Sequence, residues 1–233
     1  GDGLGGFTYS NITATGIYTK HAAVADFNND GNLDFVVGDR DNSFSIVLGN
    51  GNGTFGLAGN YAGYAQHNDV AVGDFDGDGF MDVALSRSTG NVTILLNDGT
   101  GDMLSGTNYA MGASCTQLAV ADFDADGILD VGAACNSAFT YIPGNGDGSF
   151  GSRVTASVAA SLTGIVSGDF DDDGFIDVVV LASNTNAQVI SMLNDGSGLF
   201  DGNISNTPSG IDYPSFGVAG DFNGDGNLDV AFG

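Results

Sequence analysis

The stretch DFDGDGFMD, residues 74–82, carries aspartate at its first, third, fifth and ninth positions and glycine at its sixth. Four more stretches repeat this pattern, two of them with asparagine at the third position, and the positions of all five loops are numbered from one to nine. These stretches are DFNNDGNLD at 26–34, DFDADGILD at 122–130, DFDDDGFID at 169–177 and DFNGDGNLD at 221–229. Successive first aspartates are 48, 48, 47 and 52 residues apart, so the chain is built from repeats.

The residues around each loop predict short β-strands. Apolar runs such as DVAVG precede the loops and runs such as DFVVG follow them; both are rich in β-branched residues and too short for helices. A second turn, rich in Asn-Gly and Asp-Gly, follows at 48–56, 95–103, 142–151 and 192–200. Such dipeptides supply the positive φ angles of tight hairpins. Each repeat therefore predicts four antiparallel strands in about 48 residues, the size of a propeller blade.

We predict an all-β protein of five four-stranded, blade-like repeats. A β-propeller is the first arrangement, and an open repeat array forming part of a fibre is the alternative. Residues 1–233 form a single repeat domain. Its units are 17–64, 65–112, 113–160, 161–211, and a partial unit at 212–233 that residues 1–16 complete.

The incomplete unit makes the ends of the chain a candidate contact surface. Unpaired strand edges favour pairing with other chains, and stacked repeats bury their faces against adjacent repeats. We therefore expect either a parent chain that continues past Gly233 or ends that join neighbouring subunits or repeats. Because the chain starts at Gly1 without methionine, we also expect it to be a processed or excised piece of a longer protein.

The charge of the chain excludes several classes of partner. All 29 acidic residues are aspartates and only four residues are basic, which gives a formal net charge of -25. Nucleic-acid binding needs a basic footprint, so it is excluded, and an anionic membrane surface is disfavoured for the same reason. No apolar run is long enough to insert into a membrane. The hydrophobic fraction of 42% nevertheless indicates a folded chain rather than a disordered acidic one.

The alternating acids of each loop predict a calcium site. Calcium takes six to eight oxygen ligands, and short acids on a curled loop can direct several oxygens inward. Glycine at position six allows a sharp turn, and the chemical variety at position seven is typical of a ligand that binds through its backbone carbonyl. Magnesium fits less well, because it retains much of its water and rarely uses all-protein cages.

Positions one, three, five, seven and nine supply the predicted ligands. They are Asp26, Asn28, Asp30, Asn32 and Asp34; Asp74, Asp76, Asp78, Phe80 and Asp82; Asp122, Asp124, Asp126, Ile128 and Asp130; Asp169, Asp171, Asp173, Phe175 and Asp177; and Asp221, Asn223, Asp225, Asn227 and Asp229. Without a cation, two such charges about 4 Å apart would repel by roughly 4 kcal/mol at an effective dielectric constant of 20. A helical EF-hand is rejected, because position twelve carries Val37, Leu85, Ala133, Val180 or Phe232 instead of an acid.

The remaining residues predict structural roles. The phenylalanine at position two and the apolar residue at position eight are expected to anchor each loop in the core. Cys115 and Cys135 flank one loop and could face each other in a hairpin, so we predict a disulfide between them, with two buried thiols as the alternative. His21 and His67 have no nucleophile or carboxylate at a catalytic spacing, so we expect surface or packing roles and no enzyme activity.

The DxDxDGxxD loop between two strands, followed by a glycine-rich turn such as GNGDGSF at 144–150, resembles the FG-GAP/VCBS repeat of integrin α-subunit propellers and secreted bacterial proteins. The resemblance covers nearly the whole chain. It implies β-propeller blades, structural Ca²⁺ at loop positions one, three, five, seven and nine, and roles in adhesion or carbohydrate-linked processes. The chain differs in copy number, with five units where integrin-like propellers have seven blades.

These observations favour an extracellular or cell-surface module with a structural or adhesive role, in which about five Ca²⁺ ions, one per loop, rigidify the repeats. Two alternatives remain. The first is a carbohydrate-binding propeller, although the chain has no tryptophan and only seven tyrosines as sugar platforms. The second is an accessory domain of a secreted polysaccharide-active enzyme whose catalytic part lies outside these residues.

Overall fold

The computed structural model describes residues 19–39, 43–64, 67–158, 160–183, 188–206 and 214–233. Within these ranges the chain forms strands, and no helix that could cross a membrane is found there. Four sheets have four antiparallel strands in chain order, and a fifth sheet has two. We call these sheets units one to five.

The strands of units one and two are β1 (Thr19–Ala25), β2 (Asp34–Asp39), β3 (Ser43–Gly49), β4 (Phe55–Ala62), β5 (His67–Gly73), β6 (Asp82–Arg87), β7 (Asn91–Leu95) and β8 (Thr107–Ala110). Those of units three and four are β9 (Cys115–Ala121), β10 (Asp130–Cys135), β11 (Ala138–Ile142), β12 (Val154–Ser157), β13 (Leu162–Gly168), β14 (Asp177–Ala182), β15 (Gln188–Asn194) and β16 (Phe200–Asn206). Unit five has β17 (Gly217–Gly220) and β18 (Asp229–Phe232). Each sheet falls inside one of the predicted units, and residues 1–16, predicted to complete unit five, lie outside the described residues.

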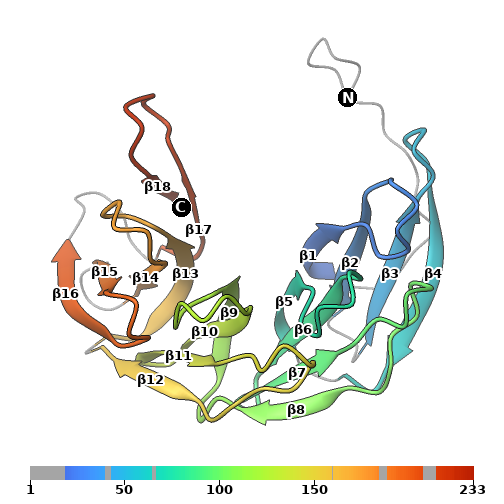
Figure 1. The fold of residues 1–233 in the computed structure, drawn as a ribbon, viewed down its shortest axis with the longest axis horizontal. Helices are drawn as coiled ribbons and strands as arrows, with labels where there is room; N and C mark the ends of the chain where they lie inside the picture. Colours follow the sequence, from blue (N-terminus) through green and yellow to red (C-terminus); the bar gives the residue numbers. More distant parts are fainter. Residues whose placement is uncertain (1–18, 40–42, 65–66, 159, 184–187, 207–213) are drawn as a thin grey trace.

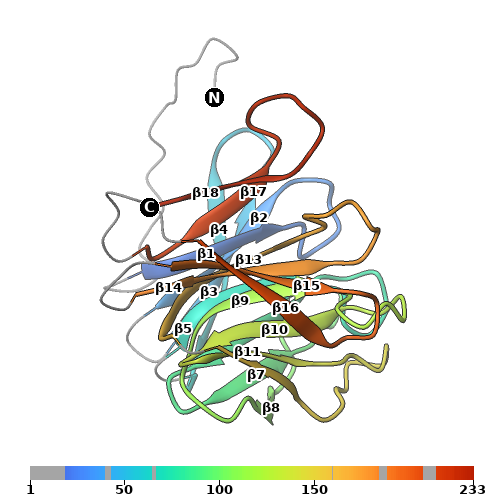
Figure 2. The same ribbon diagram turned by 90° about the vertical axis from the view of Figure 1, so that its left-hand side faces the viewer.

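Both kinds of turn lie on one face of the molecule. The first and third strands of each four-stranded sheet run in the same direction, because neighbouring strands are antiparallel. The aspartate loop follows the first strand and the glycine-rich turn follows the third, so the two turns emerge at the same edge of the sheet (Figure 2). This arrangement brings the two turns of a unit together.

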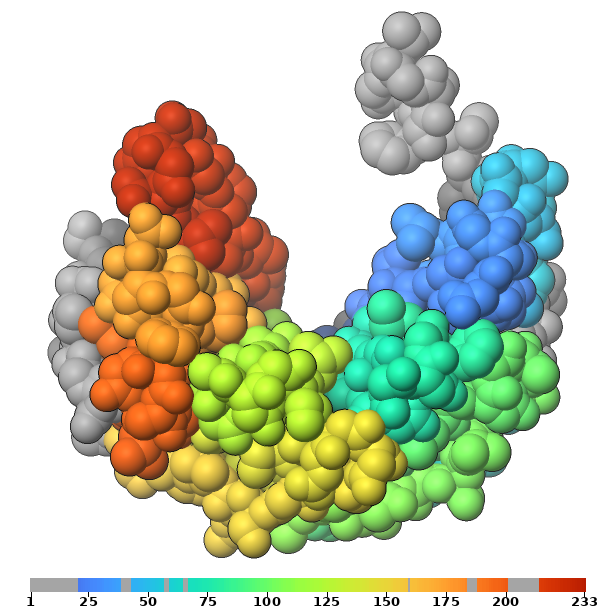
Figure 3. Space-filling model, in the orientation of Figure 1, coloured from blue at the N-terminus to red at the C-terminus, as the bar shows by residue number. Residues whose placement is uncertain are grey.

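The units stand side by side in an open arc (Figure 1). The first strand of each sheet lies on the inside of the arc, where β1 contacts β5, β5 contacts β9, β9 contacts β13 and β13 contacts β17. Units one and five face each other across the open mouth of the arc, as the space-filling view also shows (Figure 3). The described residues therefore form blade-like repeats without a closed ring.

The hydrophobic core lies between units rather than within them. One cluster combines Phe27 and Phe44 of unit one with Val83 and Leu85 of unit two. Two further clusters join unit two to unit three and unit three to unit four in the same way. We call each such contact a junction. Because apolar burial is the main favourable term in folding, the stability of each unit depends on its neighbours.

The junctions explain which loop residues are buried. Side chains at position two face the following unit, and Phe27, Phe75 and Phe123 are fully or almost fully buried, as expected. Side chains at position eight face the preceding unit. For example, a Cβ added at Gly73 of unit two would lie 3.2 Å from the Leu129 side chain of unit three.

Core anchoring is a wrong expectation at the two ends of the arc. Leu33, at position eight of the first loop, is 68% exposed because no preceding unit covers it in the part of the chain that is described. Phe222, at position two of the fifth loop, is 61% exposed because no following unit covers it there. Met81, at position eight of the second loop, also remains 38% exposed.

Polar contacts and a disulfide strengthen the inside of the arc. Asp69 Oδ2 accepts a 2.8 Å hydrogen bond from the Leu118 N–H of the next unit, and Gln117 Oε1 accepts a 3.0 Å bond from the Ile165 N–H. His21 Nδ1 lies 3.1 Å from Asp69 Oδ1, whereas His67 is buried. A disulfide joins Cys115 to Cys135 across the first two strands of unit three.

Candidate metal centres

Each aspartate loop is closed by its first carboxylate. Asp74 Oδ1 and Oδ2 accept hydrogen bonds of 2.8 and 3.0 Å from the N–H groups of Gly77 and Gly79. The first aspartate of every other loop accepts the N–H of its own position-six glycine in the same way. At Gly79, φ is +90° and an added Cβ would meet no atom within 4 Å, so the backbone conformation rather than lack of space requires glycine.

Position four is also left-handed, which the sequence pattern does not reveal. Asn29, Ala125 and Asp172 occupy this position with φ of 54°, 61° and 62°. A residue with a Cβ pays roughly 1–2 kcal/mol for such a conformation, less when it is Asn or Asp. The loop hydrogen bonds hold the backbone in this curled form.

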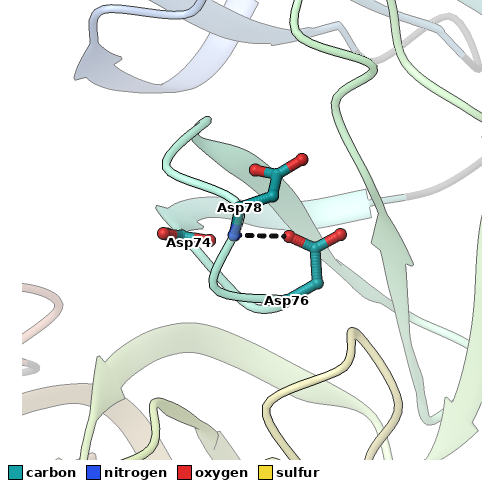
Figure 4. Close-up of side chains that lie close together, drawn as sticks. All are labelled: Asp74, Asp76 and Asp78. Carbon is teal, nitrogen blue, oxygen red and sulfur yellow. Dashed lines mark hydrogen bonds between the residues drawn. The ribbon is translucent and has the colours of Figure 1, made fainter.

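Three loops bring three carboxylates together. Oxygens of Asp74, Asp76 and Asp78 lie within 4.8 Å of one another, and the Asp78 N–H donates to Asp76 (Figure 4). The other two groups are Asp122, Asp124 and Asp130, and Asp169, Asp171 and Asp177. Asp82, Asp126 and Asp173 do not belong to the groups of their own loops. In the described part of the chain no group of three forms at the first and fifth loops, which carry Asn28 and Asn223 at position three.

Position seven makes a backbone contact and a side-chain contact. In each loop its N–H donates to the position-five aspartate at 2.8 or 2.9 Å. Its side chain covers a glycine of the second turn of its own unit: a Cβ added at Gly99 would lie 2.7 Å from the Phe80 ring, and one at Gly196 would lie 2.5 Å from the Phe175 ring. The proposed role of its carbonyl oxygen as a ligand stays a prediction.

The ninth aspartate links the two turns of its unit. Asp82 is fully buried; its Oδ2 accepts the Phe75 N–H of the loop and its Oδ1 accepts the Asn97 N–H of the second turn, both at 2.8 Å. Asp34, Asp130 and Asp177 make the same pair of contacts at 2.7 to 2.9 Å. This residue therefore has a structural role beside its predicted role as a ligand.

The carboxylates of the acid-rich loops repel one another. Burial raises the pKa of Asp82 and of Asp130 from 3.8 to about 6. Burial raises the pKa of Asp76 as well, and the charges of Asp78 and Asp74 add to the shift. In the first loop, by contrast, the backbone N–H of Asn32 lowers the pKa of Asp30. For Asp76, Asp82 and Asp130, the hydrogen bonds that lower the pKa are therefore outweighed by burial and by the neighbouring negative charges.

One oxygen of the third loop points to a missing positive partner. Asp124 Oδ1 is buried and has no hydrogen-bond partner, and Asp124 has a carboxylate oxygen within 4.8 Å of oxygens of Asp122 and Asp130. Leaving a buried charged acceptor unpaired costs more than about 1–3 kcal/mol. The residues present therefore fit a hard cation such as Ca²⁺, since every donor is an oxygen and several are carboxylates.

Two buried asparagines were missed by the sequence reasoning. Asn97 Nδ2 donates to the Phe27 carbonyl of the preceding unit at 2.7 Å and to Met81 at 3.1 Å. Its Oδ1 accepts the N–H groups of Gly99 and Gly101. Asn194 repeats these contacts between units three and four. The available signal is the Leu-Asn-Asp-Gly run that both turns share, although this run by itself predicts only a hairpin.

Comparison with known proteins agrees with the repeat structure. A family model described as an FG-GAP-like repeat matches residues 26–85, 74–133, 122–180 and 169–232. Among curated proteins, none matches the chain at a significant level.

Solved structures show the same fold. The chain is similar to a lectin of Agrocybe aegerita, in a structure described as recognition of non-reducing terminal N-acetylglucosamine, with 22% identity and a TM-score of 0.56. The match covers 80% of this chain but 51% of that one, so the chain spans about half of the lectin's length. A Photorhabdus luminescens Tc holotoxin pore matches with 18% identity and a TM-score of 0.51, over 90% of this chain and 10% of that one. At these identities the likeness establishes the fold alone.

The Asn97→Ala variant should test the junction contacts. It leaves the buried Phe27 carbonyl without its partner, so we expect the free energy of unfolding to fall by about 2–3 kcal/mol. Asn50→Ala is the matched control, because Asn50 is an exposed turn asparagine whose side chain bonds Thr54. Urea unfolding measures both, and equal losses would contradict the assigned role of Asn97.

Metal-free protein should lose stability as the pH rises from about 4 to above 6. The raised pKa values of Asp82 and Asp130 mean that the folded state binds more protons than the unfolded state in this window, so deprotonation favours unfolding. Calcium-loaded protein should show the opposite trend, because protons compete with the metal for carboxylate oxygens.

Melting temperatures at several pH values, with and without chelator, measure both trends. Asp82→Asn should weaken the metal-free trend. Asp98→Asn should not weaken it, because the hydrogen bonds of Thr100 lower the pKa of Asp98, which has the opposite effect on the dependence of stability on pH. A metal-free melting temperature that rises across this window would contradict the assignment.

Proposed function

The chain belongs to the FG-GAP-like repeat family, and from that premise we propose that it is a non-catalytic, calcium-stabilised repeat module with a structural or adhesive role outside the cell. The observation that carries the proposal is the buried, unpartnered Oδ1 of Asp124 among the carboxylates of its loop. A divalent cation at this point would supply the positive charge that the surrounding oxygens lack.

Several residues of each loop would supply oxygen ligands to the ion. In the second, third and fourth loops, the carboxylates at positions one and three and one further carboxylate already lie close enough to share an ion. The further carboxylate is at position five in the second loop and at position nine in the third and fourth loops. In the first and fifth loops, the amide oxygens of Asn28 and Asn223 would replace one carboxylate. Because the hydrogen bonds of positions one, five and nine hold the loop in place, binding would need little rearrangement of the backbone.

Several features support an extracellular setting. The Cys115–Cys135 disulfide is typical of oxidising compartments. Extracellular calcium modules bind their ion at roughly 10⁻⁴ to 10⁻³ M, which suits loops that are largely exposed on one face. The ion would then stabilise both the loop and the junction beside it.

Calcium should raise the melting temperature, and chelation should lower it. At a concentration a hundred times the Kd, each independent site would add about 2.7 kcal/mol to the free energy of unfolding. Differential scanning calorimetry with calcium and with EDTA measures the change. A melting temperature that does not respond to either addition would contradict the proposal.

A pair of variants locates the effect in the third loop. Asp124→Asn keeps the shape of the side chain but removes one negative charge, so it should reduce the calcium-dependent shift. Asp147→Asn is the matched control, because Asp147 is exposed on the glycine-rich turn of the same unit and bonds Ser149. Equal calcium responses of the two variants would exclude Asp124 as a ligand.

Carbohydrate binding is the second candidate function. It is favoured by the likeness to the Agrocybe aegerita lectin, whose structure is described as recognising non-reducing terminal N-acetylglucosamine. Isothermal titration of the calcium-loaded chain with N-acetylglucosamine tests this candidate, and absence of heat at millimolar sugar would set it aside.

A further inference from the structure

A pocket of about 200 Å³ lies at the junction of units two and three. One wall is the link at 111–113, which connects β8 to β9, and the other wall is formed by residues of unit three: Cys135, Ala138, Thr140, Arg153 and Thr155. Both sheets beside this junction have all four strands, and their outermost strands, β8 and β12, lie on the outer side of the arc (Figure 1). None of the lining residues belongs to an aspartate loop, so the pocket is separate from the candidate metal centres.

The link at 111–113 is a fixed wall of this pocket. The Met111 N–H donates to the Gly90 carbonyl of unit two at 2.9 Å, and the Asn136 N–H of unit three donates to the Ser114 carbonyl at 3.2 Å. Met111 is only 2% exposed and belongs to the core cluster of the junction. Because both units hold the link in place, the pocket is formed before any ligand binds, as is usual for small-molecule sites.

Arg153 brings a positive charge to the pocket. Its side chain is exposed and its guanidinium lies over the link, since a Cβ added at Gly112 would lie 2.5 Å from Nη1 of Arg153 and 2.8 Å from Cζ. Gly112 has a φ of +92°, so the link needs glycine here for its backbone conformation as well as for the space that the guanidinium occupies. The link and the arginine therefore fit each other.

No ion pair between Arg153 and a carboxylate is found among the described residues. This is unusual in a chain with 29 aspartates and only four basic residues, where acidic partners are abundant. A guanidinium offers five N–H donors in a planar fork whose geometry matches the two oxygens of a carboxylate. Arg153 thus keeps this fork for a ligand that enters the pocket.

The rest of the pocket has one polar and one apolar side. The hydroxyls of Thr140 and Thr155 lie 3.3 Å apart and share one hydrogen bond. The hydroxyl that accepts this bond still has its own proton to donate to a ligand. Met111, Cys135 and Ala138 supply apolar surface. A ligand that suits both sides carries one anionic group and a short apolar part.

We propose that this pocket binds a small organic molecule with a single carboxylate, which pairs with the guanidinium of Arg153. The apolar part of the ligand lies against Met111 and Ala138, and the pair of threonine hydroxyls donates a further hydrogen bond. The volume is below the roughly 300–1,000 Å³ of sites for drug-sized molecules, so the ligand has few heavy atoms. A carboxylate is favoured over an inorganic dianion, because the net charge of -25 repels two charges about twice as strongly as one.

Titration with butyrate tests the proposal, with butyramide as its neutral counterpart of the same shape. Nuclear magnetic resonance of the calcium-loaded chain measures binding through the backbone amide signals of Gly112 and Ala113. Butyrate should shift these signals saturably, and butyramide should bind at least about tenfold more weakly, because it lacks the charge that Arg153 pairs. Sulfate serves as the dianion and glucuronate as a carboxylate on a sugar. Tighter binding of either carboxylate than of sulfate supports the site, and their order shows whether aliphatic or sugar acids fit it better.

Two variants locate the binding at the guanidinium. Arg153→Gln should weaken butyrate binding about ten- to a hundredfold, because it removes a charge-assisted pair of hydrogen bonds. Its melting temperature should stay close to that of the wild type, since the side chain is exposed. Arg87→Gln is the matched control, because it removes the same charge from the end of β6, outside the pocket lining, and it should bind butyrate as the wild type does. Arg153→Lys keeps the charge but not the planar fork, so its affinity should be intermediate.

Several results would overturn the proposal. They are signals of Gly112 and Ala113 that do not respond to either carboxylate, equal affinity for butyrate and butyramide, equal affinity of the Arg153→Gln and Arg87→Gln variants, and tighter binding of sulfate than of butyrate. The titration is repeated with EDTA to separate this pocket from the proposed calcium sites. Binding that persists in EDTA supports a site independent of the metal. Binding that disappears while the chain stays folded would place the carboxylate on a loop-bound ion and would also overturn the proposal.

Discussion

The carboxylate at the ninth position of each loop is the interaction on which the rest of the structure depends. At Asp82 one oxygen holds the start of the aspartate loop and the other holds the second turn, fifteen residues along the chain from it. The aspartate loop and the second turn are thereby joined. Because the same carboxylate is buried, its negative charge is costly in the absence of a nearby cation. In the third and fourth loops this carboxylate also belongs to the acidic group, so the fold and the proposed metal binding share one side chain there.

The joined turns in turn organise the contact between units. Once the second turn is fixed on its own loop, Asn97 can reach the Phe27 carbonyl of the unit before it, and the position-two phenylalanine is buried beneath it. At the junction of units two and three, the Gly148 N–H takes the role of the asparagine. An ion bound in a loop would thus lie beside a junction and not at an isolated surface site. This proximity links the proposed calcium sites to the stability of the whole arc.

Much of the fold could be predicted from the sequence, because its repeat period, its apolar runs and its glycine positions are local signals. Gly79, for instance, is required by a positive φ that any such turn imposes. The direction of the position-eight side chain could not be predicted, since it faces another unit and one repeat does not encode which one. For the same reason, the sequence placed Leu33 in the core, although it is exposed. The roles of Asn97 and of the left-handed Ala125 depend on contacts that exist only after the turns have met. At the candidate sites, the sequence identified the acidic residues, but it did not show which carboxylates are buried and therefore have a raised pKa.

The sharing of each core between two units has a consequence for how such a chain can change over evolutionary time. Every unit presents one kind of surface forward and the complementary kind backward, so the surfaces exposed by excising a whole repeat would match each other. An insertion or duplication of about 48 residues, the spacing of the first loops, would likewise preserve every contact around it. A gain or loss of a few residues within a strand would instead misalign two cores at once. Selection on this architecture should therefore accept changes of length in whole repeats and reject them in fractions, which makes the repeat itself the unit of inheritance.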